Sequence, residues 1–150
     1  MYQTGCNAYR QSAGNTIEDN RVVLLKLYNG TLKFIANAKR GLIENSPKIR
    51  GENISKVMAI ITELDCALDM DKGGALSLQL RGLYRYVMAQ LTSGNIHNDL
   101  KSLDRAETIL LTLKEGFEAA LQQQKNTISA SVQTPGLEMH RPMERVSCAI

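Results

Sequence analysis

The spacing of apolar side chains between residues 16 and 124 constrains the fold of this chain more than any other feature. Apolar residues recur there every three or four positions, which is the period of an amphipathic α-helix. Pro47 is the only proline within residues 1–134, so long helices are allowed over most of that range. No segment alternates apolar and polar residues as a half-buried strand does. The sequence therefore predicts an all-α fold.

Start and stop signals divide this range into four helices. Ser46 followed by Pro47 is typical of a helix start, and Gly73-Gly74 is typical of a helix end. The expected helices span residues 16–44, 47–73, 75–93 and 98–124. On the third helix the predicted core stripe, with Tyr84 at its flank, is Leu76, Leu80, Leu83, Val87 and Leu91. Short connections between the helices predict an antiparallel up-down four-helix bundle.

The two ends of the chain lack this periodicity. Residues 1–15 are polar and contain glycine, whereas residues 125–150 are rich in Ser, Thr, Gln and scattered charges. We therefore expect an N-terminal arm over residues 1–15, a bundle domain over residues 16–124 and a flexible C-terminal tail over residues 125–150.

Charge and motifs exclude several classes of function. The 18 basic and 15 acidic residues give a net charge of +3, which is too mild for a nucleic-acid-binding face. No apolar stretch approaches the about 20 residues of a membrane span. His97 and His140 lie in turn or tail sequence, and no phosphate-binding loop or metal-ligand spacing is present. We expect no enzyme activity, no cofactor, no metal, no nucleic-acid partner and no membrane insertion.

Cysteine usage bears on the compartment. Cys6, Cys66 and Cys148 are odd in number and far apart, so a disulfide framework is not expected. The first residues do not have the pattern of a signal peptide. Both observations favour a reducing, cytoplasmic environment.

Several apolar side chains lie outside the stripes that would form the bundle core. On the first helix the apolar arc exceeds half of the circumference, whereas a bundle helix needs roughly 100°. Leu78 and Tyr86 on the third helix, and Leu111 on the fourth, lie off the main stripes. Single surface apolar residues are normal, but large contiguous patches are rare on monomers. The surplus favours a grooved surface that takes up an amphipathic segment, its own or another chain's.

Several motifs occur in an order and at spacings that agree with one known family over residues 8–121. They are Ala8-Tyr9-Arg10-Gln11, residues 27–35, residues 60–64, Leu68-Asp69 with Gly73-Gly74, residues 80–86 and the turn at residues 95–99. On these motifs the chain resembles the flagellar secretion chaperone FliS family. Two features of the family are missing. The first helix lacks the usual Ser-Pro-Glu-Glu-like start, and the last helix has Phe117 in place of a Trp.

The resemblance implies a cytoplasmic helical bundle that binds the disordered C-terminal segment of flagellin. Such a chaperone prevents premature polymerisation and delivers flagellin to the flagellar type III secretion apparatus, where an export-gate component is a partner. The matching positions for flagellin binding are Tyr9, Gln11, Leu27, Tyr28, Gly30, Leu64, Leu68, Leu83, Tyr84 and Tyr86. Leu78 and Leu111, which lie off the main stripes, are also expected to line this groove.

Two alternatives stay open from the sequence. Most of these residues are also compatible with the bundle core, Leu64, Leu68 and Leu83 above all. The apolar surplus is also compatible with a weak homodimer, in which case the chain is a self-assembling structural or regulatory bundle. Gly30 and Gly82 lie inside expected helices, where glycine is unfavourable. Close approach by a neighbouring helix or by the client would explain them, and a single tolerated glycine also fits.

Overall fold

The computed structural model describes residues 17–132. The predicted arm, with Tyr9 and Gln11, and most of the predicted tail lie outside the described residues. By its internal contacts the chain divides into two units, residues 1–117 and residues 118–150. The bundle is the described part of the first unit.

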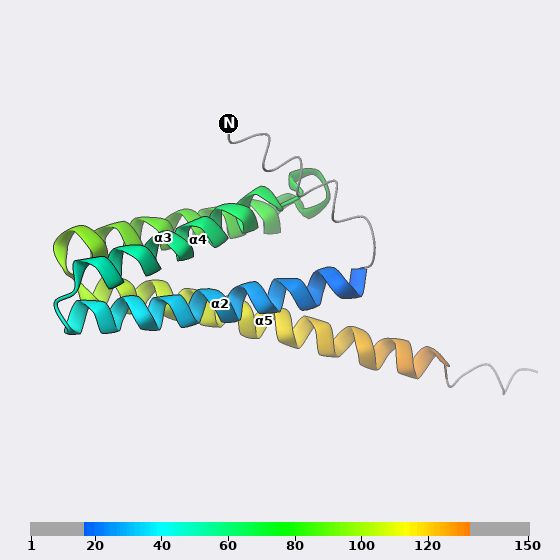
Figure 1. The fold of residues 1–150 in the computed structure, drawn as a ribbon. Helices are drawn as coiled ribbons and strands as arrows, with labels where there is room; N and C mark the ends of the chain where they lie inside the picture. Colours follow the sequence, from blue (N-terminus) through cyan, green and yellow to red (C-terminus); the bar gives the residue numbers. More distant parts are fainter. Residues whose placement is uncertain (1–16, 133–150) are drawn as a thin grey trace, which may run out of the picture. The chain divides into compact units, whose positions relative to one another are not determined.

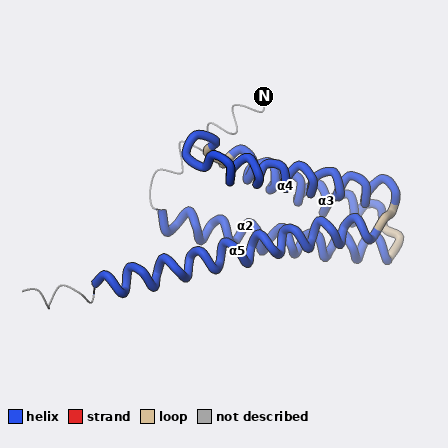
Figure 2. Tube along the Cα trace, turned by 180° about the vertical axis from the view of Figure 1, so that it is seen from behind, coloured by secondary structure: helices blue, strands red, loops and turns tan. Residues whose placement is uncertain are grey.

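The described residues form four helices and no strand, which confirms the all-α class. The helices are α2 (Ile17–Ile43), α3 (Pro47–Cys66), α4 (Met70–His97) and α5 (Leu100–Val132). Within the first unit α3 and α4 form one layer over α2 and the first part of α5, and consecutive helices run in opposite directions (Figures 1 and 2). This is the expected up-down arrangement.

The helix boundaries differ from the sequence prediction at the α3–α4 corner. α3 ends at Cys66, before Gly73-Gly74, because Asp69 caps a new helix. The Asp69 Oδ1 atom accepts hydrogen bonds from the backbone N–H groups of Asp71 and Lys72, each at 3.0 Å. Gly74 instead forms a kink inside α4, with a φ of 49° that favours glycine. At the other end of the chain α5 continues to Val132, past the predicted end near residue 124.

Two glycines allow close packing at the end of the bundle where α2 meets α3 and α4 meets α5. A Cβ atom on Gly41 would lie 2.7 Å from the backbone N of Arg50, and one on Gly94 would lie 2.6 Å from Cδ2 of Leu103. The Arg50 guanidinium also donates to the side-chain oxygens of Asn95 and Asn98. This end is therefore closed by backbone contact and side-chain hydrogen bonds.

The core stripe of α4 differs from the prediction at two positions, each shifted by one residue. Ser77 and Tyr84 are buried, whereas Leu76 and Leu83 are 62% and 37% exposed. The prediction was wrong here because it preferred leucine to a serine. The Ser77 hydroxyl is satisfied inside the protein, since it donates to the backbone oxygen of Asp69 at 2.8 Å. The other buried apolar side chains come from all four helices and are Tyr28, Ile35, Ala38, Ile54, Val57, Ile61, Leu64, Val87, Leu91, Leu103, Ala106 and Leu110.

The expectation of unpaired cysteines is not met at Cys66, the last residue of α3, which is disulfide-bonded in the structure.

Two tyrosines join α2 to α4 across the core. The hydroxyl oxygens of Tyr28 and Tyr84 lie 2.7 Å apart and share a hydrogen bond. The Tyr28 ring also packs on Phe117 of α5, with the ring centroids 5.6 Å apart. Burial raises the pKa of both phenols, so both stay protonated at neutral pH. Each hydroxyl therefore satisfies the other where water is excluded.

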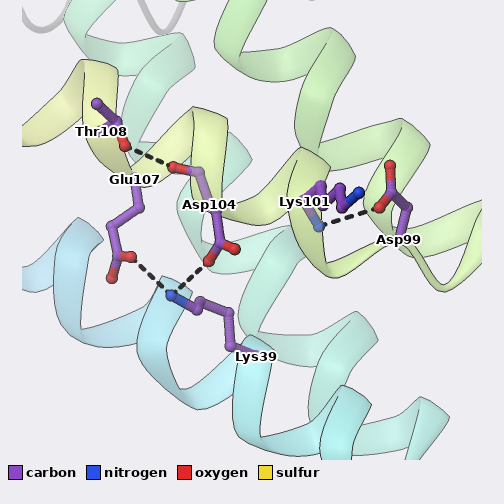
Figure 3. Close-up of polar contacts among 6 residues, drawn as sticks. All are labelled: Lys39, Asp99, Lys101, Asp104, Glu107 and Thr108. Carbon is purple, nitrogen blue, oxygen red and sulfur yellow. Dashed lines mark hydrogen bonds and ion pairs between the residues drawn. The ribbon is translucent and has the colours of Figure 1, made fainter.

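An ion-pair cluster joins α2 to α5 at the surface. The Lys39 Nζ atom lies 2.7 Å from Oδ1 of Asp104 and 2.7 Å from Oε2 of Glu107 (Figure 3). Hydrogen bonds to Asp104 and Glu107 hold the pKa of Lys39 above the ordinary lysine value. The cluster therefore favours the charged form of Lys39 in the folded state.

Removing one tyrosine hydroxyl tests the buried pair. Tyr28→Phe should lower the free energy of unfolding by about 1–2 kcal/mol, because it leaves the Tyr84 hydroxyl buried without its partner. The double variant Tyr28→Phe/Tyr84→Phe should lose less than the sum of the two single variants, since no orphaned hydroxyl remains. Urea denaturation of the four proteins measures this coupling. Strictly additive losses would show that the two hydroxyls do not depend on each other.

Removing the Lys39 charge tests the surface cluster. Lys39→Met should lower the free energy of unfolding by about 1 kcal/mol, since Asp104 and Glu107 then repel each other without a cation between them. Because the folded pKa of Lys39 is raised, the difference from wild type should be complete at neutral pH. It should shrink as pH rises through that raised pKa. Lys33→Met, on the exposed side of α2, is the control, and an equal loss there would contradict a specific role for Lys39.

Candidate functional site

A cleft of about 340 Å³ lies at the end of the first unit where α2 and α4 begin and α3 ends. The residues that line it are Asn20, Arg21, Leu24, Leu64, Ala67, Leu68, Asp69, Leu80, Tyr84 and Phe117. The cleft forms because the apolar stripes of the helices reach this end, while the α3–α4 corner at residues 67–69 turns the chain away. The cleft lies at one end of the bundle, and the close contacts at Gly41 and Gly94 lie at the other end.

The walls of the cleft are apolar and fixed in place. Leu64 and Tyr84 are buried core residues, and Leu24, Leu68, Leu80 and Phe117 pack against the core. Tyr84 and Phe117 both contact Tyr28, so the buried tyrosine pair supports this wall from behind. The hydrogen bond to Tyr28 occupies the Tyr84 hydroxyl, and the ring is left as an apolar surface.

The charged and amide side chains of the cleft are those of Asn20, Arg21 and Asp69, and Arg21 is half-buried. Asn20 and Asp69 are exposed, and the Asp69 carboxylate already caps α4. The lining includes no Ser, Cys, His or Lys side chain. A nucleophile beside a base, or a cluster of metal ligands, is therefore missing from this lining. The cleft is suited to burying apolar side chains of a bound segment.

The structure separates the predicted site residues into several groups. Leu64, Leu68 and Tyr84 line the cleft, and Tyr28 lies buried behind it. Leu27 and Gly30 are partly exposed on α2, outside the cleft lining. The others are exposed elsewhere, Leu78, Leu83 and Tyr86 on α4 and Leu111 on α5. Within residues 17–132 they do not form one site.

No close approach at the two helical glycines comes from the described part of the chain. A Cβ atom added to Gly30 or to Gly82 would have no atom within 4 Å. Neither glycine is therefore required by packing inside the described part of the chain.

Sequence reasoning did not single out Leu24, Leu80 or Phe117 as lining residues. Leu80 belongs to the predicted core stripe of the third helix, and Leu24 and Phe117 follow the helical apolar spacing of the first and last expected helices. The available signal was their position near the end of a stripe, where a side chain has fewer neighbours from the other helices. The Oδ1 atom of Asp65 on α3 pairs with Nε of Arg81 on α4 at 3.2 Å.

Residues 17–132 contain no group of His, Cys, Asp and Glu side chains that is arranged to hold a metal ion. Among the four described helices, none combines the length and the apolar character that a membrane span requires.

Comparison with known proteins identifies the family. A family model described as flagellar protein FliS matches residues 1–124. The flagellar secretion chaperone FliS of Bacillus subtilis is 30% identical over 123 residues, which cover 82% of this chain and 90% of that protein. The corresponding protein of Salmonella typhimurium is 28% identical over 120 residues, covering 77% and 88%. The flagellar secretion chaperone FliSB of Pseudomonas aeruginosa is 35% identical over 92 residues, covering 61% and 73%.

The family match includes every residue of the cleft, and its relatives are named as chaperones rather than enzymes. The apolar cleft without catalytic groups agrees with such a role. The chain therefore belongs to the flagellar protein FliS family and has the family's role as a flagellar export chaperone.

Proposed function

We propose that this protein is a cytoplasmic chaperone for flagellin that binds the disordered C-terminal segment of its client. Binding would keep flagellin from polymerising early and would deliver it to the flagellar type III secretion apparatus through an export-gate component. The apolar cleft at the start of α2 is the observation that carries this proposal. An amphipathic segment can bury its apolar side chains there without any chemical step.

The size of the cleft indicates how the client would be held. A volume of about 340 Å³ is at the small end for binding pockets and accepts only a few side chains. A long client segment would therefore continue over neighbouring surfaces, where Leu27 and Gly30 on α2 and Leu111 on α5 remain proposed contacts. Because a disordered client must become ordered, a cleft anchor combined with weaker outer contacts favours moderate affinity and release in steps.

The predicted arm fits the same scheme. Residues 1–15 precede α2, whose first turns supply Asn20, Arg21 and Leu24 to the cleft. We propose that Tyr9 and Gln11 belong to the client-binding region, because they lie shortly before these cleft residues in the sequence. Residues 1–15 carry Tyr2 and Tyr9 as their only large apolar side chains besides Met1, so they add little to the stability of the bundle.

Binding to full-length and truncated flagellin tests the proposal. Isothermal titration calorimetry should show a 1:1 complex with full-length flagellin and none with flagellin that lacks its C-terminal segment. Leu68→Lys should weaken the complex by about tenfold or more, because it places a charge in the apolar cleft. Ile43→Lys, at the opposite end of the bundle and 68% exposed, is the matched control and should bind like wild type.

Two outcomes would contradict the proposal. One is equal affinity for truncated and full-length flagellin. The other is an equal effect of Leu68→Lys and Ile43→Lys while urea denaturation shows both variants to be folded. Light scattering over a concentration series tests the homodimer alternative, because a stable dimer that flagellin does not dissociate would assign the cleft to self-association.

A further inference from the structure

The outward side of α4 differs in composition from the other exposed helix faces. No Asp or Glu occurs between Lys72 and Asn98, and Arg81 and Arg85 are the only charged side chains there. The α2 segment between Asp19 and Glu44 also lacks Asp and Glu. The exposed side of α2, in contrast, carries Lys26, Lys33 and Arg40. Exposed faces of soluble helices are normally rich in charge. The outward side of α4 is therefore an exception that the fold does not explain.

We define the outer face of α4 by Leu78, Gly82, Arg85, Tyr86, Ala89 and Ile96, all of which are exposed. At about 100° per residue, Gly82 lies on the side of the helix opposite the buried Leu91. Leu78 is 63% exposed, Tyr86 45% and Ile96 68%. A row of large apolar side chains at this exposure is typical of an interaction surface.

Gly82 gives a second, independent indication. A Cβ atom at this position would have no atom within 4 Å, so packing within the described part of the chain does not require glycine. Glycine also weakens a helix relative to alanine. A small residue at the centre of an exposed apolar row permits another helix to approach its backbone closely. The exposed apolar row and the glycine at its centre together favour a helix as the partner that covers the outer face of α4.

Charge identifies the chemistry of that helix. Arg85 lies within the row and has no ion-pair partner among the described residues, whereas Arg81 is paired with Asp65. A partner that carries carboxylates beside its apolar stripe would pair with Arg85 at the edge of the contact. The complementary surface is therefore an acidic amphipathic helix.

The α4 helix and the terminal segments of this chain do not supply such a helix. A second copy would present the same acid-free α4, and residues 1–15 contain no Asp or Glu. Residues 133–150 contain Glu138 and Glu144, but Pro135 and Pro142 interrupt that segment for a helix. The helices α3 and α5 do carry Asp and Glu, but their apolar stripes are buried in their own bundle. The structure therefore favours an occupant from another protein.

We infer that the outer face of α4 docks an acidic amphipathic helix of a second protein while the client occupies the cleft. The two surfaces use different sides of α4, since Leu80 and Tyr84 line the cleft and Leu78 and Gly82 lie on the outer face. Only the assignment of the cleft to the client rests on the proposed function. The protein then has two binding surfaces that can be occupied together.

Two synthetic peptides of roughly 18 residues, about five helical turns, test this inference. They share the same leucine and alanine stripe and carry either Glu or Lys on its flanks. The full-length chain, labelled for NMR, should bind the Glu peptide at least about tenfold more tightly than the Lys peptide. The chemical shift changes should centre on residues 78–89. Arg85→Glu should reverse the preference, and Gly82→Gln should weaken binding of both peptides by about tenfold.

Lys33→Glu is the matched control, because it changes the net charge by the same amount on the exposed side of α2. It should leave the preference for the Glu peptide unchanged. Equal binding of the two peptides, no saturable binding of the Glu peptide, or equal effects of Arg85→Glu and Lys33→Glu would overturn the inference.

Repeating the titration on the preformed complex with flagellin separates the two claims. Unchanged affinity for the Glu peptide is expected. Displacement of the peptide by flagellin would assign the outer face to the client. This result would overturn the inference of a second partner, but the proposed function would stand. Failure of flagellin to bind at all would overturn the proposed function and leave the peptide result on α4 intact.

Discussion

The hydrogen bond between the hydroxyls of Tyr28 and Tyr84 is the interaction on which the candidate site depends most. It joins α2 to α4 through the core, and the Tyr28 ring also packs on Phe117 of α5. Tyr84 and Phe117 then form part of the cleft wall. A buried pair of phenols is stable only if each satisfies the other, so the distance between these helices is fixed. A wall held in this way can bind apolar side chains without first becoming ordered itself.

The sequence was sufficient for the fold class, because four stripes at helical spacing allow few arrangements other than a bundle. It was less reliable where two physical signals compete. Gly73-Gly74 indicated a helix end, but the Asp69 side chain begins α4 earlier and Gly74 becomes a kink. Leu76 and Leu83 were expected in the core, but their neighbours Ser77 and Tyr84 are buried instead. Ser77 can be buried because its hydroxyl has a hydrogen-bond partner. Apolar character alone does not distinguish a core leucine from one that remains exposed.

The candidate site was predictable only in part, for a related reason. Leu64, Leu68 and Tyr84 were identified by resemblance, yet the cleft needs the start of α2, the end of α3 and the start of α4 to meet beside Phe117 of α5. The spacing of residues along one helix does not show where a neighbouring helix stops. The outer face of α4 carries apolar side chains that the sequence assigned to the same groove. The structure places them on a different side of that helix, which gives a small protein room for a client and a second partner.

Intermolecular methyl contacts provide the most direct test that the cleft receives the client. In a complex of the methyl-labelled chain with an unlabelled flagellin C-terminal peptide, nuclear Overhauser effects should connect the peptide to Leu24, Leu68 and Leu80. Ile43 and Ile96, at the opposite end of the bundle, should show none. Contacts confined to Ile43 and Ile96, with the cleft methyls unchanged, would contradict the account.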